Sequence, residues 1–303
     1  MLTAEIKDAL VAVECAELIF DEPLSRHTTL KMGGPADVWV APETVKKAQA
    51  ICGIAAKYKT PIQSVGGGSN LLVRDKGVRG IVLSSRQLRR IEKKDSHGIY
   101  VQSGVSTGKL LSKALEWELG DLEFLGGVPG TVGGGLKMNA GTYLGEFVDV
   151  TETVRSLVLS TGEMVERSKK ECGFRYRGSD LPTTEWIVDA ELHCPHRPKE
   201  AMKETIRSLR ERRKEREPHK VSNAGSVFKN PEGDYAGRLL EEAGFKGKSV
   251  GNAMCSPVHA NWFVNTGGAT TKDMLKLIAM AREEIKNKFD VDLLLEWKVI
   301  GEE

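Results

Sequence analysis

The sequence lacks an excess of charge of either sign and lacks long apolar runs. Its 44 Lys and Arg residues and 42 Asp and Glu residues leave a net charge of +2, which gives no reason to expect nucleic acid or a membrane as partner. No run of about 18 apolar residues, the length that a transmembrane helix needs, occurs. Acidic residues among positions 1–20 are typical of an amphipathic helix, because a signal peptide needs an uncharged core. We therefore expect a cytoplasmic protein.

Cysteine is scarce as well. The 303 residues contain five cysteines, an odd number, and none of them forms a CxxC pair. Free thiols in a reducing compartment are the expected state of such a set. A structural metal site needs clustered ligands, and these cysteines are dispersed, so we expect no metal.

The common nucleotide-binding motifs are missing. No stretch fits G-x-G-x-x-G, the fingerprint of the doubly wound dinucleotide fold. Residues 104–110 imitate a phosphate-binding P-loop, but three residues separate the glycines where four are needed. Leu110 also stands where a Ser or Thr would bind Mg²⁺. A cofactor with phosphates must therefore be bound in another way.

Strand-like and helix-like stretches alternate between about residues 36 and 195, which predicts an α+β fold. Pro42 is expected to open a helix that reaches about residue 58. Residues 106–118 have apolar spacing typical of a helix, and residues 148–159 of a strand. The prolines at 195 and 198 favour a domain boundary. It would separate a region 1–196, with two α+β subdomains after an N-terminal helix, from a domain 197–303.

The second predicted domain also mixes helices and strands. A charged helix over about 199–217 is expected to end before Pro218. A long helix is expected over about 272–288, and Thr270 and Asp273 have the spacing of a capping box at its start. Residues 291–300 are predicted to form the closing strand.

Three separated segments stand out against this ordinary background. Residues 65–73 read VGGGSNLLV, and residues 127–135 read GVPGTVGGG and lead into MNAG at 138–141. Glycines without Cβ atoms allow a ligand to approach the main chain closely, and successive N–H groups can bind an anion. Two tight turns would be the simpler interpretation of the same glycines.

The third segment, residues 224–231, reads AGSVFKNP and carries one serine, Ser226, between a glycine and stiff residues. This setting favours a chemical role for its hydroxyl. The simpler alternative is a turn serine that bonds its own backbone.

In this order and spacing, the segments resemble the UDP-N-acetylenolpyruvoylglucosamine reductase family, over about residues 27–301. These FAD enzymes, also called UDP-N-acetylmuramate dehydrogenases, complete UDP-N-acetylmuramate for the bacterial cell wall. The resemblance implies the FAD-binding fold of the vanillyl-alcohol oxidase and p-cresol methylhydroxylase type, followed by a C-terminal α+β substrate domain.

The resemblance also implies which residues lie along FAD. No His or Cys occurs in 66–73 or 126–141, so the flavin should be bound non-covalently. Gly135 stands where the family more often has alanine, which should relax the loop. The expected FAD-binding residues are Gly66, Gly67, Gly68, Ser69, Asn70, Thr131, Gly133, Gly134, Asn139 and Gly141.

The implied reaction passes hydride from NADPH through FAD to C3 of the enolpyruvyl ether and adds a proton at C2. Arg177, in CGFRYR at 172–177, matches the arginine that holds the substrate carboxylate, and Glu296 matches the family's acid. Ser226 is the implied proton donor. The simpler interpretations are that Arg177 is a surface or salt-bridge arginine and that Glu296 is only exposed to solvent. Trp297 and Lys298 follow Glu296 where the family has valine and arginine.

Other implications concern the substrates. Lys229 and Asn230 are expected to contact the enolpyruvyl sugar. Only about eight residues separate Arg177 from the next predicted strand, so the chain resembles the shorter type of the family, without the tyrosine loop that covers the substrate. The expected partners are NADPH and the sugar nucleotide, with no nucleic acid, no membrane and no evident protein partner. An FAD-dependent alcohol or sugar oxidase of the same fold and a non-catalytic nucleotide-binding module remain the alternatives.

Overall fold

The computed structural model describes residues 2–303, whose contacts group them into two compact units. The first unit comprises the chain up to Asp21, then Asp37–Gly67 and Gly80–Glu211. The second comprises Glu22–Ala36, Gly68–Arg79 and Arg212–Glu303. The predicted division of roles between 1–196 and 197–303 stays a prediction.

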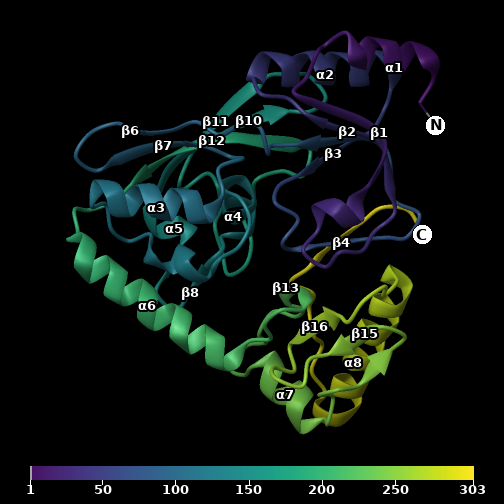
Figure 1. The fold of residues 1–303 in the computed structure, drawn as a ribbon, viewed down its shortest axis with the longest axis vertical. Helices are drawn as coiled ribbons and strands as arrows, with labels where there is room; N and C mark the ends of the chain where they lie inside the picture. Colours follow the sequence, from purple (N-terminus) through teal and green to yellow (C-terminus); the bar gives the residue numbers. More distant parts are fainter. Residues whose placement is uncertain (1) are drawn as a thin grey trace. The chain divides into compact units, whose positions relative to one another are not determined.

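The first unit contains a four-stranded sheet covered by two helices. The strand order is β1 (Glu17–Pro23), β2 (Pro35–Ala41), β5 (Val78–Ser84) and β3 (Ile62–Val65), with β3 parallel to β5. Helices α1 (Ala4–Val11) and α2 (Val45–Tyr58) lie over this sheet (Figure 1). Ile6, Leu10 and Ile51 are buried there against strand residues such as Val38 and Ile81, so apolar burial joins helices and sheet.

A second sheet of the first unit is antiparallel. Its order is β11 (Met164–Ser168), β10 (Thr151–Val158), β12 (Glu185–His193), β7 (Gly98–Gln102) and β6 (Ile91–Lys93). Five helical segments lie around it: α3 (Thr107–Trp117), η2 (Glu123–Gly127), α4 (Val132–Met138), α5 (Phe147–Val150) and α6 (Lys199–Arg216). They share one core with the strands, which includes Val101, Leu110, Leu136, Phe147 and Ile206.

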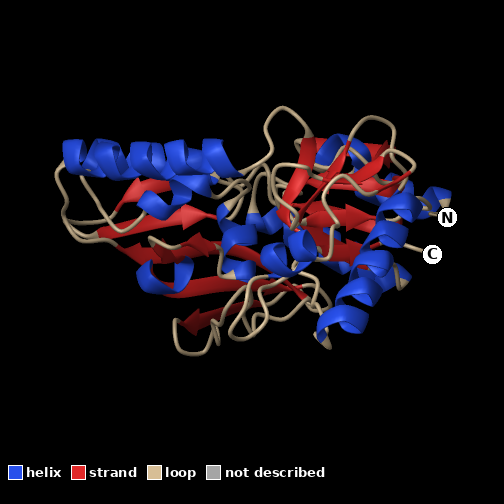
Figure 2. Cartoon of the chain, turned by 90° about the horizontal axis from the view of Figure 1, so that it is seen from below, coloured by secondary structure: helices blue, strands red, loops and turns tan. Residues whose placement is uncertain are grey.

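The second unit is built on the sheet β13 (Ser222–Ser226), β16 (Trp262–Asn265), β15 (Ala253–Cys255) and β14 (Ser249–Val250). Helices α7 (Ala236–Glu242) and α8 (Thr271–Phe289) pack on it, and β17 (Lys298–Ile300) pairs in parallel with β4 (Leu71–Val73). A short η1 turn (Leu24–His27) belongs to this unit too. Its core gathers aromatic residues, including Phe228, Phe245, Phe263 and Trp297. Figure 2 shows the mixture of helices and strands that confirms the α+β class.

Two predicted helix starts are confirmed by their caps. Ser106 accepts a hydrogen bond from Lys109 N at the start of α3. At the start of α8, Thr270 Oγ1 accepts from Asp273 N at 3.1 Å, while Asp273 Oδ2 accepts from Thr270 N at 3.2 Å. These reciprocal bonds satisfy N–H groups that have no partner inside the helix.

Four local predictions were wrong. The N-terminal helix ends at Val11, because the later apolar residues belong to β1 and pack against its sheet. Helix α2 begins after Thr44, whose hydroxyl caps Lys47 N, and not at Pro42. Residues 147–150 form a helical turn before β10 begins.

The fourth wrong prediction concerns the closing strand. Only residues 298–300 form a strand, because Trp297 turns into the core and donates its Nε1–H to Ala224 O at 2.9 Å. Before it, Leu295 makes only an isolated bridge with Phe228. Among residues 2–303, no helix is long and apolar enough to cross a membrane.

Candidate active site

The two glycine segments meet in the first unit. A Cβ atom added at Gly66 would lie 2.8 Å from Thr131 Oγ1, and one at Gly67 would lie 2.9 Å from Gly130 Cα. A Cβ atom at Gly133 would lie 2.8 Å from Ser103 Cβ. Such distances are too short for ordinary side chains, so glycine at these positions is what allows the two segments to approach.

Two buried hydroxyls at this meeting point have no hydrogen-bond partner within the described residues. They are Thr131 Oγ1 and Ser103 Oγ. A buried polar group without a partner costs free energy, so such groups usually indicate a missing ligand or water. Thr131 is 9% exposed, and its glycine-rich segment fits the diphosphate of FAD, whereas Ser103 is 0% exposed and out of a ligand's reach.

Helix α4, which begins after its N-cap Thr131, offers few free N–H groups to a phosphate. The first two N–H groups of α4, from Val132 and Gly133, donate to Val105 O and Ser103 O, each at 2.9 Å. They are already used by the protein, so the Thr131 hydroxyl and the glycine backbone carry the fit to a phosphate.

Gly135 does not lie in a relaxed loop, which corrects the sequence expectation. It lies within α4, and a Cβ atom there would come 2.2 Å from the Phe147 ring. The Phe147 ring occupies the space that an alanine methyl group at position 135 would need, because a packed interior leaves no spare volume.

The other half of the first glycine segment belongs to the second unit. Gly68 has a φ of +68°, and a Cβ atom there would lie 1.9 Å from His27 O. Asn70 donates its Nδ2–H to Glu296 O at 3.0 Å and accepts from Lys298 N at 2.9 Å. Asn70 therefore holds the segment that carries Glu296, and its contact with FAD stays a prediction.

Asn139, like Asn70, bonds neighbouring segments of the chain through its side chain. It ends α4 in the left-handed conformation, with a φ of 43°, and is 1% exposed. Its amide donates to Glu146 Oε2 at 2.7 Å and to Arg175 O at 3.2 Å, while its oxygen accepts from Val148 N at 2.9 Å. The side chain thus joins three segments, and any contact of Asn139 with FAD stays a prediction.

Arg177 lies at the tip of a tight turn. Arg175 and Gly178 close the turn through two backbone hydrogen bonds, and Arg177 has a φ of 51°, a conformation that favours Gly or Asn. An arginine in this position suggests that its side chain is needed, since nothing in the backbone favours it.

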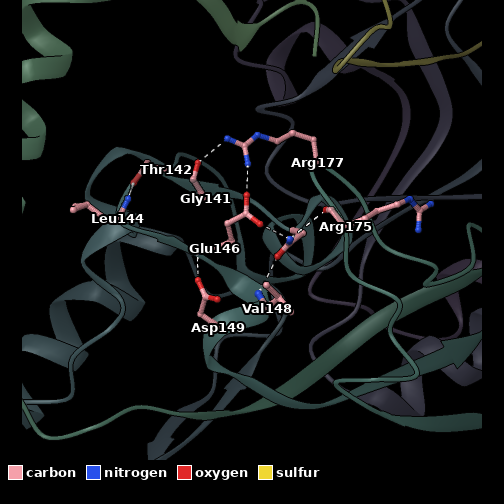
Figure 3. A network of polar contacts seen from close by, with 9 residues as sticks. Gly141, Thr142, Leu144, Glu146, Val148, Asp149, Arg175 and Arg177 are labelled. Atoms are coloured by element: carbon pink, nitrogen blue, oxygen red, sulfur yellow. Dashed lines mark hydrogen bonds and ion pairs between the residues drawn. The ribbon is translucent and has the colours of Figure 1, made fainter. Parts of the chain in front are cut away.

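The guanidinium of Arg177 faces two acceptors from the second glycine segment and its extension. It donates to Glu146 Oε1 at 3.0 Å and to Gly141 O at 3.1 Å (Figure 3). Gly141 and Glu146 face each other across the small β8–β9 hairpin (Gly141–Thr142 and Gly145–Glu146). The structure therefore brings Arg177 and Gly141 together, as members of one cluster. Glu146 was missed by the sequence analysis, although it lies only five residues after Gly141.

Ser226 and Glu296 are brought together in the second unit through their neighbours. Ser226 ends strand β13, which corrects its expected place in a loop, and is half-buried. Val227 O, one residue further, accepts from Glu296 N at 2.8 Å. The two predicted catalytic residues therefore lie on adjoining backbones, and main-chain bonds set their spacing.

An asparagine clamps the backbone after Ser226. Asn261 accepts from Phe228 N at 3.0 Å through Oδ1 and donates to Phe228 O at 2.8 Å through Nδ2. Its own carbonyl accepts from Val227 N at 2.8 Å. Nearby, burial lowers the pKa of His259, whose Nδ1 accepts from Asn261 N. His259 and Asn261 thus act as supports of the serine segment.

The two predicted substrate contacts follow in the same segment. Lys229 N donates to Leu294 O at 2.9 Å, and Asn230 Oδ1 accepts from Ala236 N at the start of α7 at 3.2 Å. Burial raises the pKa of the Cys172 thiol to about 11, which keeps this thiol protonated near neutral pH.

Comparisons with known proteins agree with this geometry. The model of an FAD binding domain matches residues 36–168, and that of the UDP-N-acetylenolpyruvoylglucosamine reductase C-terminal domain matches residues 217–300. An alkyldihydroxyacetonephosphate synthase shares the fold over 65% of this chain and 41% of its own, with a TM-score of 0.51 and 19% identity. The FAD binding domain and the shared fold therefore define an FAD-binding fold of the vanillyl-alcohol oxidase type.

Similarity over nearly the whole chain identifies the family. The UDP-N-acetylenolpyruvoylglucosamine reductase of Carboxydothermus hydrogenoformans is 38% identical over 99% of both chains. That of Caldanaerobacter subterraneus subsp. tengcongensis is 40% identical over 94% of both. The crystal structure of the Thermus caldophilus reductase matches with a TM-score of 0.79 and 36% identity, covering 93% of this chain and 98% of its own. The chain belongs to the UDP-N-acetylenolpyruvoylglucosamine reductase family.

Proposed function

We propose that the protein reduces UDP-N-acetylglucosamine enolpyruvate to UDP-N-acetylmuramate, a peptidoglycan precursor, with NADPH as reductant. FAD, when bound, would relay the hydride from NADPH to C3 of the enolpyruvyl group. The observation that carries the proposal is the near full-length similarity to the reductase family, together with a first unit whose buried Thr131 hydroxyl fits a diphosphate.

The cofactor would be held mainly by the first unit. Gly66, Gly67 and Gly134 would allow its diphosphate to approach the backbone, and Thr131 would donate its hydroxyl hydrogen. The remaining predicted residues would line the cofactor further along the two segments: Gly68, Ser69 and Asn70 in the first, and Gly133, Asn139 and Gly141 in the second.

Arg177 would bind the substrate carboxylate. An enol ether is electron-rich, so hydride addition at C3 builds negative charge that must be delocalised into the neighbouring carboxylate. A guanidinium presents several N–H donors in one plane and can stabilise that charge as it develops. Glu296 would provide a second, hydrogen-bonding group for the same purpose.

Ser226 would donate the proton to C2. A serine hydroxyl is a weak acid, but the carbon that it faces becomes strongly basic once hydride has been added at C3. Its position at the end of β13, beside the backbone of Glu296, supports a fixed donor. Lys229 and Asn230 follow directly and would contact the sugar nucleotide.

A cytoplasmic location and independence from any protein partner complete the proposal. NADPH and nucleotide-linked sugars are made and kept inside the cell, so their enzyme is expected there. Fractionation of the source cells, with the protein detected by antibody, would check the location.

The decisive experiment is an anaerobic absorbance titration of the purified protein. A yellow protein should lose its flavin absorbance on addition of NADPH and regain it on addition of the enolpyruvyl sugar nucleotide. Recovery only after admission of oxygen would favour an oxidase of the same fold. A protein that stays colourless after incubation with FAD would overturn the proposed function altogether.

A further inference from the structure

Glu146 is the acidic partner of the arginine that is proposed to bind substrate. Its Oε1 accepts from Arg177 at 3.0 Å, and the pair is largely shielded, with side-chain exposures of 28% for Glu146 and 19% for Arg177. Charge-assisted bonds of this kind are stronger and more directional when water is partly excluded. The pair can therefore set the direction in which the guanidinium points.

Glu146 is itself held from two sides, so it can act as a fixed reference. Its backbone N–H donates to Asp149 Oδ2 at 2.8 Å (Figure 3). Its Oε2 accepts from Asn139 at 2.7 Å. Asn139 ends the helix α4 that begins at Thr131. A continuous set of contacts thus runs from the proposed cofactor segment through Asn139 and Glu146 to Arg177.

We propose that Glu146 is a positioning residue for the reduction of the enolpyruvyl group: it aims the Arg177 guanidinium at the substrate carboxylate. This inference rests on the proposed function. A second consequence follows from the charge. Glu146 neutralises part of the Arg177 charge, so its presence weakens ground-state attraction for the carboxylate while it fixes the geometry needed in the transition state.

The variant that separates these effects is Glu146→Gln. Arg177 faces Oε1 of Glu146 and Asn139 faces Oε2. In glutamine an NH₂ group replaces one of these oxygens, so one of the two donors would meet another donor. We expect kcat to fall by about 10–100-fold, because small displacements of a positioning group have effects of this size. We expect KM for the enolpyruvyl sugar nucleotide to stay within about threefold or to decrease, since Arg177 loses its counter-charge.

Two further measurements exclude a merely structural role. Flavin reduction by NADPH, followed in a stopped-flow instrument, should stay at the wild-type rate in E146Q while reoxidation by the sugar nucleotide slows. Binding of UDP-N-acetylmuramate to the oxidised enzyme, measured by calorimetry, should be as tight as in wild type or tighter. Glu146→Asp keeps two acceptor oxygens and should recover part of the lost kcat.

Glu152→Gln is the matched control. Glu152 lies in β10 of the same unit, its side chain is 55% exposed, and its ion-pair partner His193 is 3.8 Å away. It should leave every rate unchanged. An E146Q enzyme with kcat within twofold of wild type, or one in which both half-reactions slow equally, would overturn the inference. If the wild-type enzyme is not reoxidised by the sugar nucleotide, the proposed function itself is wrong and the inference fails with it.

Discussion

The two parts of the proposed catalytic set are held in opposite ways. In the first unit, contacts to Glu146 and to the Gly141 carbonyl hold the Arg177 side chain itself, on a turn whose backbone does not favour an arginine. In the second unit, main-chain bonds and the Asn261 clamp hold Ser226 and Glu296. A side-chain change should therefore misdirect the arginine, whereas the serine hydroxyl can be removed without moving its scaffold.

The largest expected effect comes from Ser226→Ala. Reoxidation of the reduced enzyme by the enolpyruvyl sugar nucleotide should slow by about 10²–10⁴-fold, the usual contribution of a positioned proton donor. Reduction by NADPH should be unchanged. Stopped-flow absorbance at the flavin band measures both. Ser222→Ala, in the same strand, is the control, and an S226A enzyme with two wild-type half-reactions would show that another group donates the proton.

Arg177→Lys tests the side-chain half of the comparison. Lysine keeps the positive charge but not the planar fork, so it cannot reproduce the contacts to Glu146 and Gly141 together. We expect reoxidation to slow by about 10²–10³-fold, the range seen when one oxyanion donor is lost. Stopped-flow reoxidation and the steady-state KM should be measured side by side. Full activity with lysine would mean that charge alone suffices and that orientation is irrelevant.

Asn261→Ala tests how the backbone that follows Ser226 is held. It leaves Phe228 N and Phe228 O without partners in a buried setting, which should lower the free energy of unfolding by about 2–4 kcal/mol. Urea unfolding followed by circular dichroism measures this change. Asn252→Ala, at an exposed asparagine, should cost far less. Equal free energies of unfolding in the two variants would show that Asn261 does not stabilise the serine segment.

Thr131→Val should have the smallest effect on folding. Its hydroxyl has no partner among the described residues, so the FAD-free protein should keep its stability to within about 0.5 kcal/mol. FAD affinity should fall by about five- to tenfold, the equivalent of one hydrogen bond.

Thr107→Val is the contrast to this variant, because the Thr107 hydroxyl donates to Val128 O at 2.6 Å and its loss should destabilise the protein by about 1 kcal/mol. Fluorescence titration with FAD and thermal melting give the two readouts for both variants. Unchanged FAD affinity in T131V would mean that the hydroxyl does not contact the cofactor.

The comparison also shows where sequence patterns sufficed. The helices α3 and α8 carry their start signals within three residues, at Ser106 and Thr270, and both were predicted correctly. The glycines at 66, 67 and 133 were expected to admit a ligand; in the structure their missing Cβ atoms let protein segments meet, and their contact with FAD stays a prediction. The start of α2 had two possible signals, Pro42 and the capping residue Thr44. The helix begins after Thr44, since its hydroxyl satisfies a helix N–H.

Contacts between distant residues were beyond the reach of such patterns. Glu146 and Arg177 are 31 residues apart, Phe228 and Asn261 are 33 apart, and Asn70 meets Glu296 across 226 residues. Gly135 was expected to relax a loop, but the Phe147 ring already fills that space. No local spacing encodes these pairs.

The motifs alone carried the resemblance to the reductase family, which implied FAD. Helix caps and turn glycines could also be found without a structure, because each acts within a few positions of itself. Only the folded chain shows that Asn70 bonds the Glu296 carbonyl and that Glu146 pairs with both Asn139 and Arg177. Those outcomes depend on how separate segments pack into one dense interior, where each polar group must find its partner.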